Sequence, residues 1–398
     1  MAKSTKAIFI IGAKRTPFCS YGGPLRDLTA SHVFSVAAKE AIRSANVDPS
    51  FIDNTIVGNV NFLSQCDGGK TPRYCGIHSG VPLSSPALGV SKACGTGMQA
   101  IIQSSVDIIT GSSMITLTGG TELMSSLPML VRNVRFGTAL GASYLLEDHI
   151  QKQIPDSYMG MTMQKMVEDL AKRYGVTREE VDEFTLRSHL KWKAAEVSNV
   201  FAQELASIPV TIKSKQILVE RDQLPRPSIK IEDLTQLPAV IENGEVLTSG
   251  NTSAPADGAA ALLIAGEEAV RDHDFRPLAR IAGWSCVGVD PADAGLGALQ
   301  AIRRLLKEQK LNVDDVDLFE INENFASQVL IAAKELKINP SMINMSGGAL
   351  AIGDPVSATG ARMATHLVHE LCRRNLERGI TASSCGGGQG IAVLLEKV

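Results

Sequence analysis

The sequence predicts an α/β fold, and three observations point to it. Short apolar runs rich in branched residues alternate with helical patterns of roughly ten to fifteen residues, as in βαβ units. Hydrophobic residues make up 44% of the chain, which is enough for a large core. Glycine is abundant, with 35 residues, while aromatic residues make up only 5%, which disfavours an all-β or disordered chain. Because 398 residues exceed one ordinary domain, two or three subdomains are expected.

The alternation occurs in two regions of the chain. In the first, strands are expected at residues 7–11, 55–60 and 114–118, with helices at residues 31–45 and 96–110. In the second, strands are expected at residues 259–264, 316–321 and 391–395, with helices at residues 299–308 and 361–373. Strands separated by helices in this way form mainly buried sheets, so two similar α/β halves are expected.

The stretch between these regions, residues 123–248, has a different composition. It is rich in methionine, charged residues and helix formers, and helices are expected at residues 162–174 and 178–198. Thr177 precedes two glutamates and offers an N-cap with acidic residues in the first turn. We therefore interpret this stretch as a mostly helical insertion between the two halves.

Charge, hydropathy and cysteine spacing exclude several classes of protein. The net charge of −3 argues against a nucleic-acid partner, which would favour a basic surface. No apolar run reaches the roughly 18–20 residues of a membrane span, so a soluble protein is expected. The odd number of cysteines and their irregular spacing indicate a reducing compartment, and none has metal-ligand spacing. By default each is interpreted as a small buried residue: Cys19, Cys66, Cys75, Cys94, Cys286, Cys372 and Cys385.

Cys94 lies in the segment VSKACGTGMQA, residues 90–100, where an apolar run stops and a helical pattern begins. Gly95 and Gly97 would let the backbone turn sharply and approach a ligand closely. A thiol at a helix N-terminus faces unpaired N–H groups and the positive end of the dipole, which favours its thiolate. The backbone N–H of Cys94 could also bind an oxyanion. The segment is typical of a nucleophilic cysteine, with a structural cysteine as the alternative.

Two other segments could contribute to a site. In SSCGGGQG, residues 383–390, Cys385 precedes three consecutive glycines. Without side chains, these glycines would expose their backbone N–H groups and leave room for a bulky ligand. A tight turn before the last strand is the alternative. Asn322 follows an expected strand, where α/β folds place their ligands, although an Asx turn would use the same residue.

The motifs, taken together and in order, resemble those of the thiolase family along essentially the whole chain, and most of all those of its mitochondrial members. The matching blocks are AKRTPF (13–18), GG (22–23), CGTG around Cys94, GGTELMS (119–125), VRNVRFGT (131–138), MGMT (159–162), GNTSAPADGAAA (250–261), NENFA (322–326), GGALAIGDP (347–355) and CGGGQG (385–390). A series of this length in this order is highly specific.

The resemblance implies a five-layered fold of two similar βαβ-type halves with an inserted loop domain. The expected division is residues 1–122 plus 249–272, the loop domain 123–248, and residues 273–398. It also implies a homo-oligomer, either a dimer or a tetramer, with no permanently bound cofactor and no metal. The implied location is the mitochondrion, with the cytoplasm as the alternative.

The implied reaction is acyl transfer between a 3-ketoacyl-CoA and coenzyme A, in either direction. By resemblance, Cys94 is the nucleophile that carries the acyl group and Cys385 is the acid/base that shuttles protons. The N–H of Gly387 and that of Cys94 would form an oxyanion hole, and Asn322 would hold a water in a second one.

Two further positions, Arg226 and Ser253, match residues that contact coenzyme A in the family.

One departure from the family bears on this chemistry. Where thiolases have Gly-His-Pro, this chain has Gly353-Asp354-Pro355. The Asp354 carboxylate can accept a proton, but its negative charge would raise the pKa of Cys94 and repel a developing oxyanion. Three interpretations follow: a thiolase with reduced or altered activity, a weakened paralogue that binds coenzyme A, or a thioesterase in which water removes the acyl group.

Overall fold

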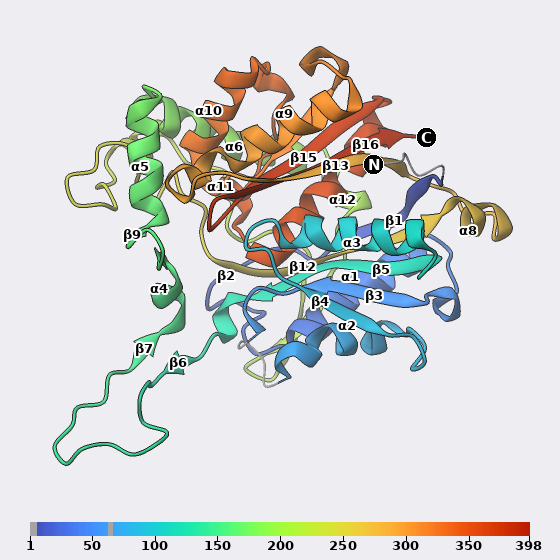
Figure 1. Ribbon diagram of the computed structural model, residues 1–398, viewed down its shortest axis with the longest axis horizontal. Coiled ribbons are helices and arrows are strands. Elements are labelled where there is room, and N and C mark those ends of the chain that lie inside the picture. The colour runs from blue at the N-terminus through green and yellow to red at the C-terminus, as the bar shows by residue number, and fades with distance from the viewer. Residues whose placement is uncertain (1–5, 63–66) are drawn as a thin grey trace.

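A mixed β-sheet forms the centre of the molecule (Figure 1). The computed structural model describes residues 6–62 and 67–398, so Cys66, interpreted above as a small buried residue, lies outside the described residues. The strand order is β14-β15-β16-β13-β1-β12-β5-β3-β4, and β2 pairs with β12. The bounds of these strands are β1 (Ile8–Arg15), β2 (Cys19–Ser20), β3 (Asn54–Gly58), β4 (Ala87–Val90), β5 (Ile115–Leu123), β12 (Ala256–Gly266), β13 (Ala279–Gly288), β14 (Leu318–Ile321), β15 (Arg378–Cys385) and β16 (Gln389–Lys397).

The two halves of the sheet have the same connectivity. In the first half, β3 and β5 are parallel, β5 pairs with β12 in the antiparallel sense, and β12 pairs likewise with β1. In the second half, β14 and β15 are parallel, β15 is antiparallel to β16, and β16 is antiparallel to β13. A short antiparallel pairing between β1 and β13 joins the halves. The expectation of two similar α/β halves is therefore confirmed.

Helices cover both outer faces of the sheet and fill the space between its halves. The outer helices of the first half pack on β1, β3, β5 and β12. In the second half one outer helix packs on β13, β15 and β16, and the other packs against that helix. Two inner helices contact each other and strands of both halves, which gives five layers (Figure 1). The first outer helices are α1 (Ala30–Ser44) and α2 (Thr71–Ser79), the inner ones α3 (Thr96–Thr110) and α12 (Val356–Arg374), and the second outer ones α9 (Gly297–Gln309) and α10 (Ala326–Leu336).

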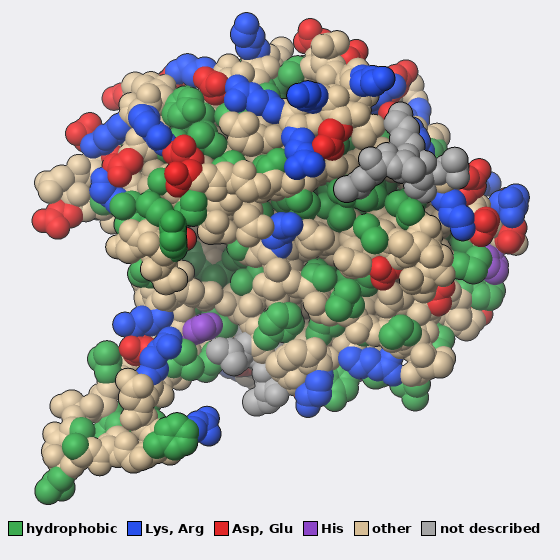
Figure 2. All heavy atoms as spheres, viewed as in Figure 1, with side chains coloured by type: hydrophobic (Ala, Val, Ile, Leu, Met, Phe, Trp, Pro, Cys, Tyr) green, Lys and Arg blue, Asp and Glu red, His purple; other side chains and the backbone are tan. Residues whose placement is uncertain are grey.

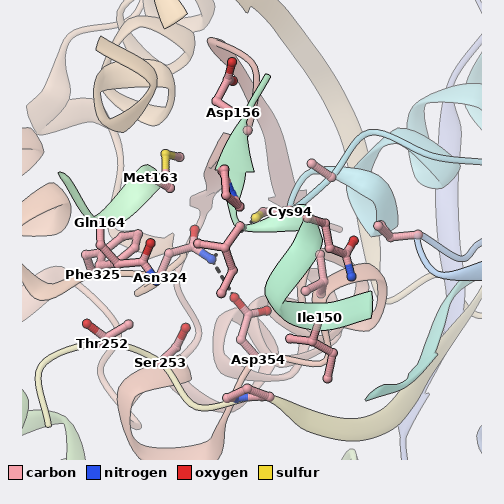
Figure 3. A pocket seen from close by; sticks show the side chains of 18 of the residues that line it. Cys94, Ile150, Asp156, Met163, Gln164, Thr252, Ser253, Asn324, Phe325 and Asp354 are labelled. Carbon is pink, nitrogen blue, oxygen red and sulfur yellow. Dashed lines mark hydrogen bonds between the residues drawn. The ribbon is translucent and has the colours of Figure 1, made fainter. Parts of the chain in front are cut away.

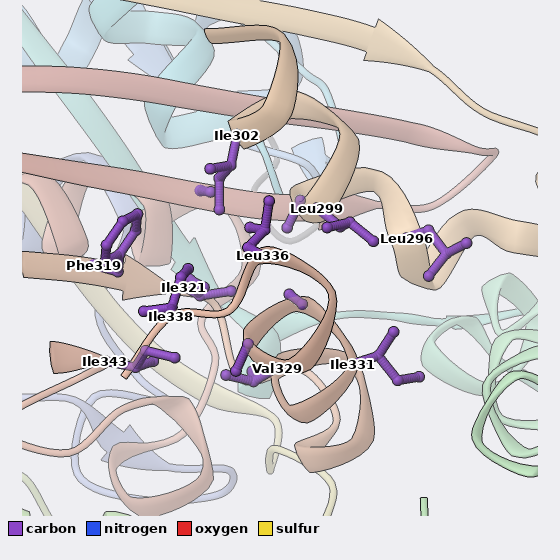
Figure 4. Close-up of a cluster of buried hydrophobic side chains, with 14 of the residues drawn as sticks. Leu296, Leu299, Ile302, Phe319, Ile321, Val329, Ile331, Leu336, Ile338 and Ile343 are labelled. Atoms are coloured by element: carbon purple, nitrogen blue, oxygen red, sulfur yellow. The ribbon is translucent and has the colours of Figure 1, made fainter. Parts of the chain in front are cut away.

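Separate apolar cores lie beneath the two outer helix layers, and one continuous core surrounds the inner helices. The outer core of the second half includes Leu299 and Ile302 of α9 and Phe319 of β14 (Figure 4). The central core includes Ile101 of α3 and Leu367 of α12, together with apolar residues of β12 and β16. Because each buried aliphatic side chain contributes about 1.5–3 kcal/mol, the middle layer binds the two halves strongly to each other.

The chain between β5 and β12 leaves the sheet and forms the inserted region. Its helices are α4 (His149–Gln153), α5 (Met163–Arg173), α6 (Arg178–Val197) and α7 (Ile231–Thr235). Its short strands are β6 (Met129–Leu130), β7 (Glu147–Asp148), β8 (Pro155–Asp156), β9 (Met161–Thr162), β10 (Ile208–Ile212) and β11 (Lys215–Val219). Thr177 caps α6 through a capping box with Glu180, as the sequence predicts.

Residues 129–148, which we call the arm, project from the body of the molecule (Figure 1). Strands β6 and β7 pair at its base. Several hydrophobic side chains are exposed along the arm (Figure 2), among them Phe136 and Leu140, which are 97% and 107% exposed. A single chain therefore leaves these side chains in water.

A buried ionic cluster attaches the inserted region to the layers. The Arg15 guanidinium of β1 donates to Glu204 Oε1 at 2.7 Å and to the two carboxylate oxygens of Asp222 at 2.6 and 2.9 Å. Glu204 also contacts His366 Nδ1 of α12 at 2.7 Å. Arg15, Glu204 and His366 are each at most 1% exposed, so the pairs hold three distant chain segments together away from water.

The expected helices and strands agree with the structure. The helix expected at residues 96–110 is α3, with the same bounds, and the two helices expected in the insertion are α5 and α6. Helices α1 and α9 begin and end within two residues of their expected bounds. Helix α12 ends one residue beyond its expected end but starts at Val356, five residues before its expected start. In the central sheet, strands β2, β4, β13 and β15 were not predicted. Among the described residues, no helix is long and apolar enough to cross a membrane.

Candidate active site

Cys94 opens into a cavity of about 520 Å³ between the layers and the inserted region. Four segments distant in sequence supply the polar end of this cavity, among them Cys94, Ser253, Asn324 and Asp354 (Figure 3). The apolar wall includes side chains of the inserted region and of the loop before α10: Met124, Ile150, Ile154, Met163, Met166 and Phe325. A cavity with an apolar wall and a few converging polar groups is typical of a small-molecule site.

The backbone before Cys94 forms a sharp elbow at the N-terminus of α3. Ala93 has a φ of 44°, an uncommon value for a residue with a side chain. Thr96 closes the elbow, because its hydroxyl accepts from Lys92 N at 2.7 Å and donates to Ala93 O at 2.7 Å. The elbow places the partly exposed Cys94 at the cavity surface, ahead of the first turn of the helix.

Asn324 is the side chain that connects the thiol to the carboxyl group. Its amide nitrogen lies 3.6 Å from Cys94 Sγ and donates to Asp354 Oδ2 at 2.6 Å, the contact marked in Figure 3. The hydroxyl of Thr359 donates to the other oxygen, Asp354 Oδ1, at 2.5 Å. Thr359 also lies 3.4 Å from Pro355 O, so its hydroxyl could donate there and accept from a protonated Asp354.

Asn322 lies behind Asn324 and does not line the cavity. It follows β14, as the sequence predicts, and is 3% exposed. Its amide nitrogen donates to Asn324 Oδ1 at 3.1 Å and lies 3.5 Å from Ser383 Oγ. Its own Oδ1 is buried without a hydrogen-bond partner. In this structure Asn322 therefore orients Asn324, while its expected role in holding a water stays a prediction.

Cys385 is fully buried at the end of β15, beneath the elbow. A Cβ atom on Gly95 would lie 2.6 Å from Cys385 Sγ, so only glycine leaves room for this sulfur. Gly97 is equally crowded, because its Cβ would lie 2.5 Å from the backbone nitrogen of Ala361 in α12. These glycines therefore serve close packing, and their expected role in ligand approach stays a prediction.

The other expected site residues differ in their positions. Ser253 lines the cavity, and its backbone N–H donates to Asn324 O at 3.0 Å. Gly387 also lines it, with a φ of 77° that favours glycine. Arg226 is exposed and is not part of the cavity wall, and its backbone N–H donates to His189 Nδ1 at 3.2 Å.

Burial controls the protonation of the site. It raises the pKa of Asp354, although hydrogen bonds from Thr359, Asn322 and Asn324 and the charge of Arg362 act in the opposite direction. Burial, followed by the charges of Asp354 and Cys385, raises the pKa of Cys94 well above its ordinary value, while the Asn324 amide lowers it. The pKa of Cys385 rises to about 12, again through burial. The expected preference of the helix N-terminus for a Cys94 thiolate is therefore outweighed, because the sulfur is largely removed from water.

Asn324 was not predicted as a site residue. Both Asn322 and Asn324 follow β14, and the pattern alone does not tell which one faces the cavity. Among the described residues, no group of three or more His, Cys, Asp or Glu side chains could hold a metal ion.

Comparison with known proteins gives consistent matches over the whole chain. Residues 8–268 match the family model for the thiolase N-terminal domain, and residues 275–397 match that for the C-terminal domain. The mitochondrial 3-ketoacyl-CoA thiolase of Homo sapiens is 41% identical over 391 residues, 98% of each chain. A probable acetyl-CoA acyltransferase of Staphylococcus aureus is 35% identical over 98% of this chain and 99% of the relative. The crystal structure of human mitochondrial 3-ketoacyl-CoA thiolase in complex with CoA superposes with a TM-score of 0.95, at 40% identity, over 99% of this chain and 98% of that chain.

Proposed function

Because this chain is an acyltransferase of the thiolase family, we propose that it transfers acyl groups between a 3-ketoacyl-CoA and CoA through a thioester on Cys94. The observation that carries the proposal is the position of Cys94, whose sulfur opens into the cavity beside Asn324 and Asp354. The apolar wall suits an acyl chain.

In the thiolysis direction, Cys94 Sγ attacks the 3-keto carbon of the substrate. The Sγ–C3 bond forms, the C2–C3 bond breaks, and Cys385 gives its proton to the departing acetyl-CoA enolate. A second CoA thiol then attacks the acyl-Cys94 carbonyl and loses its proton to Cys385. Its sulfur forms the new thioester as the Sγ–C3 bond breaks. The reverse sequence is a Claisen condensation.

Asp354 accepts the proton of Cys94 during the first attack and returns it when the sulfur is released. As an anion, Asp354 opposes the negative charge on the sulfur and on the oxyanion. Once it holds the proton it is neutral, so the repulsion ends as the oxyanion forms. Because burial raises the pKa of Asp354, the ionised acceptor forms only at higher pH than for a free carboxyl group. Its anion then opposes the oxyanion, so we expect reduced turnover.

We propose the oxyanion donors and the residues that contact CoA from their positions relative to the cavity. Gly387 lines the cavity, and its N–H and that of Cys94 would bind the oxygen of the acyl-enzyme. Ser253 would contact the pantetheine arm of CoA, since it lies in the cavity wall. The exposed Arg226 would contact the charged end of CoA outside the cavity.

The experiment is to incubate the protein with acetyl-CoA or a 3-ketoacyl-CoA and to search for acyl-Cys94 by mass spectrometry. Cys94→Ala should abolish the label. Cys372→Ala is the matched control, because Cys372 is exposed and distant in the fold from the cavity wall. Acylation of Cys94 with turnover that requires free CoA is the expected result.

Other outcomes identify the alternatives. An acyl label that water removes without CoA would indicate a thioesterase, with Asp354 activating the water. Binding of CoA without any label on Cys94 would indicate a weakened paralogue and would contradict the proposed transfer. Both substrates should be tested at several pH values, because Asp354 must be ionised to accept the proton.

We further propose that the protein is a homo-oligomer, a dimer or a tetramer. Strand β4 ends the sheet and is an edge that a second copy could extend, and Leu88 in it is 43% exposed. The apolar side chains of the arm would find a partner surface in the same assembly (Figure 2). The division into residues 1–122 plus 249–272, 123–248 and 273–398 and a mitochondrial location, with the cytoplasm as alternative, remain proposals, since relatives include mitochondrial and bacterial proteins.

A further inference from the structure

Asn324 contacts both reacting groups of the site. Its amide nitrogen lies 3.6 Å from Cys94 Sγ and 2.6 Å from Asp354 Oδ2. A side-chain amide carries two N–H hydrogens, so one can point to the sulfur while the other is given to the carboxylate. The backbone carbonyl of Asn324 accepts from Ser253 N, which holds the loop against the cavity wall.

The orientation of this amide is fixed from behind. Asn322 Nδ2 donates to Asn324 Oδ1 at 3.1 Å. The oxygen of Asn324 must therefore face Asn322, and its NH₂ group must face the cavity, where Cys94 and Asp354 lie. The Asp354 contact supports the same assignment, because an ionised carboxylate only accepts hydrogen bonds and the Asn324 atom 2.6 Å from Oδ2 is then the nitrogen.

We propose that Asn324 is a catalytic residue, whose amide stabilises the sulfur of Cys94 during attack and then donates to the carbonyl oxygen as acyl-Cys94 forms. The inference rests on the proposed function and deepens it. In the attack the Sγ–C bond forms, the carbonyl π electrons move to oxygen, and the Cys94 proton passes to Asp354. The sulfur loses its negative charge on forming the bond, so the hydrogen directed at it is released for the adjacent oxyanion.

The site needs such a donor. The Asp354 carboxylate cannot donate while it is ionised, and its charge opposes the thiolate. The amide of Asn324 acts in the opposite direction and is neutral in every step, so it favours both the thiolate and the oxyanion.

The test compares the wild type with Asn324→Leu, which keeps the side-chain size but lacks the donor. Asn339→Ala is the control, since Asn339 caps a short surface helix. The first readout is the pH profile of Cys94 alkylation by iodoacetamide, followed by mass spectrometry of its peptide. Asn324→Leu removes a hydrogen bond to the Cys94 thiolate, which should move the pH profile of alkylation to higher pH. At pH values below the midpoint of the wild-type profile, alkylation should slow about 10- to 100-fold.

The second readout is the rate of acyl-Cys94 formation from acetyl-CoA, which should fall about 10²- to 10³-fold on loss of an oxyanion donor. Asn324→Gln, which keeps the amide, should recover part of both losses and also serves if Asn324→Leu does not fold. Wild-type profiles and rates in Asn324→Leu would overturn the inference. If wild-type Cys94 is never acylated, the proposed function fails, while the alkylation profiles still decide the role of Asn324.

Discussion

The crossing of α3 and α12 at Gly97 yields the most direct test of how the fold positions the site. A Cβ atom on Gly97 would lie 2.5 Å from Ala361 N and 2.8 Å from Ser357 O of α12. Ordinary contact begins at 3.4 Å, so Gly97→Ala requires the helices to separate by about 0.9 Å at this point. Cys94 and Asp354 lie at the N-termini of these two helices, so the separation also moves the two groups apart.

The expected effect on activity exceeds the effect on stability. Overpacking costs about 1–3 kcal/mol, and the better helix propensity of alanine offsets about 1 kcal/mol of it. A displacement of about 1 Å between reacting groups can lower a rate about 10²-fold. We therefore expect Gly97→Ala to remain folded, with a slightly lower melting temperature and a loss of about 10²-fold in acyl-Cys94 formation.

The assay is the rate of acyl-Cys94 formation, with a thermal melt of each variant. Gly288→Ala is the control, because nothing lies within 4 Å of its Cβ position and its φ is not in the left-handed region. Gly360→Ala should repeat the effect from the other helix, since its Cβ would lie 2.8 Å from Met98 N. A Gly97→Ala protein that melts no lower and acylates as fast as the wild type would refute the reasoning.

Four other perturbations test separate features. Asp354→Asn should stabilise the protein increasingly as pH rises above 3.8, because burial raises the pKa of Asp354 in the folded state and the unfolded chain loses this proton first; melts at acidic and neutral pH that show equal shifts would contradict this. Asp354→His should raise CoA-dependent turnover, because a neutral imidazole accepts the Cys94 proton without placing an anion beside the oxyanion; unchanged or lower kcat would count against the proposed role of Asp354. Arg15→Met should cost about 3–5 kcal/mol in urea unfolding, because Glu204 then loses a buried partner, and a loss below 1 kcal/mol would be inconsistent. Replacing Phe136 and Leu140 by serine should reduce the assembly measured by light scattering without lowering the melting temperature of the monomer, whereas an unchanged mass would exclude the arm as a contact.

The sequence predicted those parts of the fold that have a local signal. The helix at residues 96–110 and the cap at Thr177 follow from periodicity and side-chain chemistry, and the structure has both. Strand β15 escaped prediction because its residues are mostly small or polar, and it is recognised as a strand through its pairing with β14 and β16.

The sequence was enough to predict the nucleophile of the site, but not which side chains lie around it. Cys94 was identified from the motif, whereas Asn324 contacts it across 230 residues of sequence, a proximity that no local pattern encodes. Burial likewise depends on the whole fold. The sequence placed Cys94 at a positive helix end, but the surrounding layers raise its pKa.

The shared middle layer has a consequence for how the molecule comes apart. Neither half can keep α3 or α12 covered when the other half is gone, because the central core contains residues of both. Although a chain of 398 residues would ordinarily melt in several steps, the two halves should lose their structure together, as one peak in a calorimetric scan. For the same reason, a substitution that disturbs the crossing of α3 and α12 should destabilise both halves of the molecule.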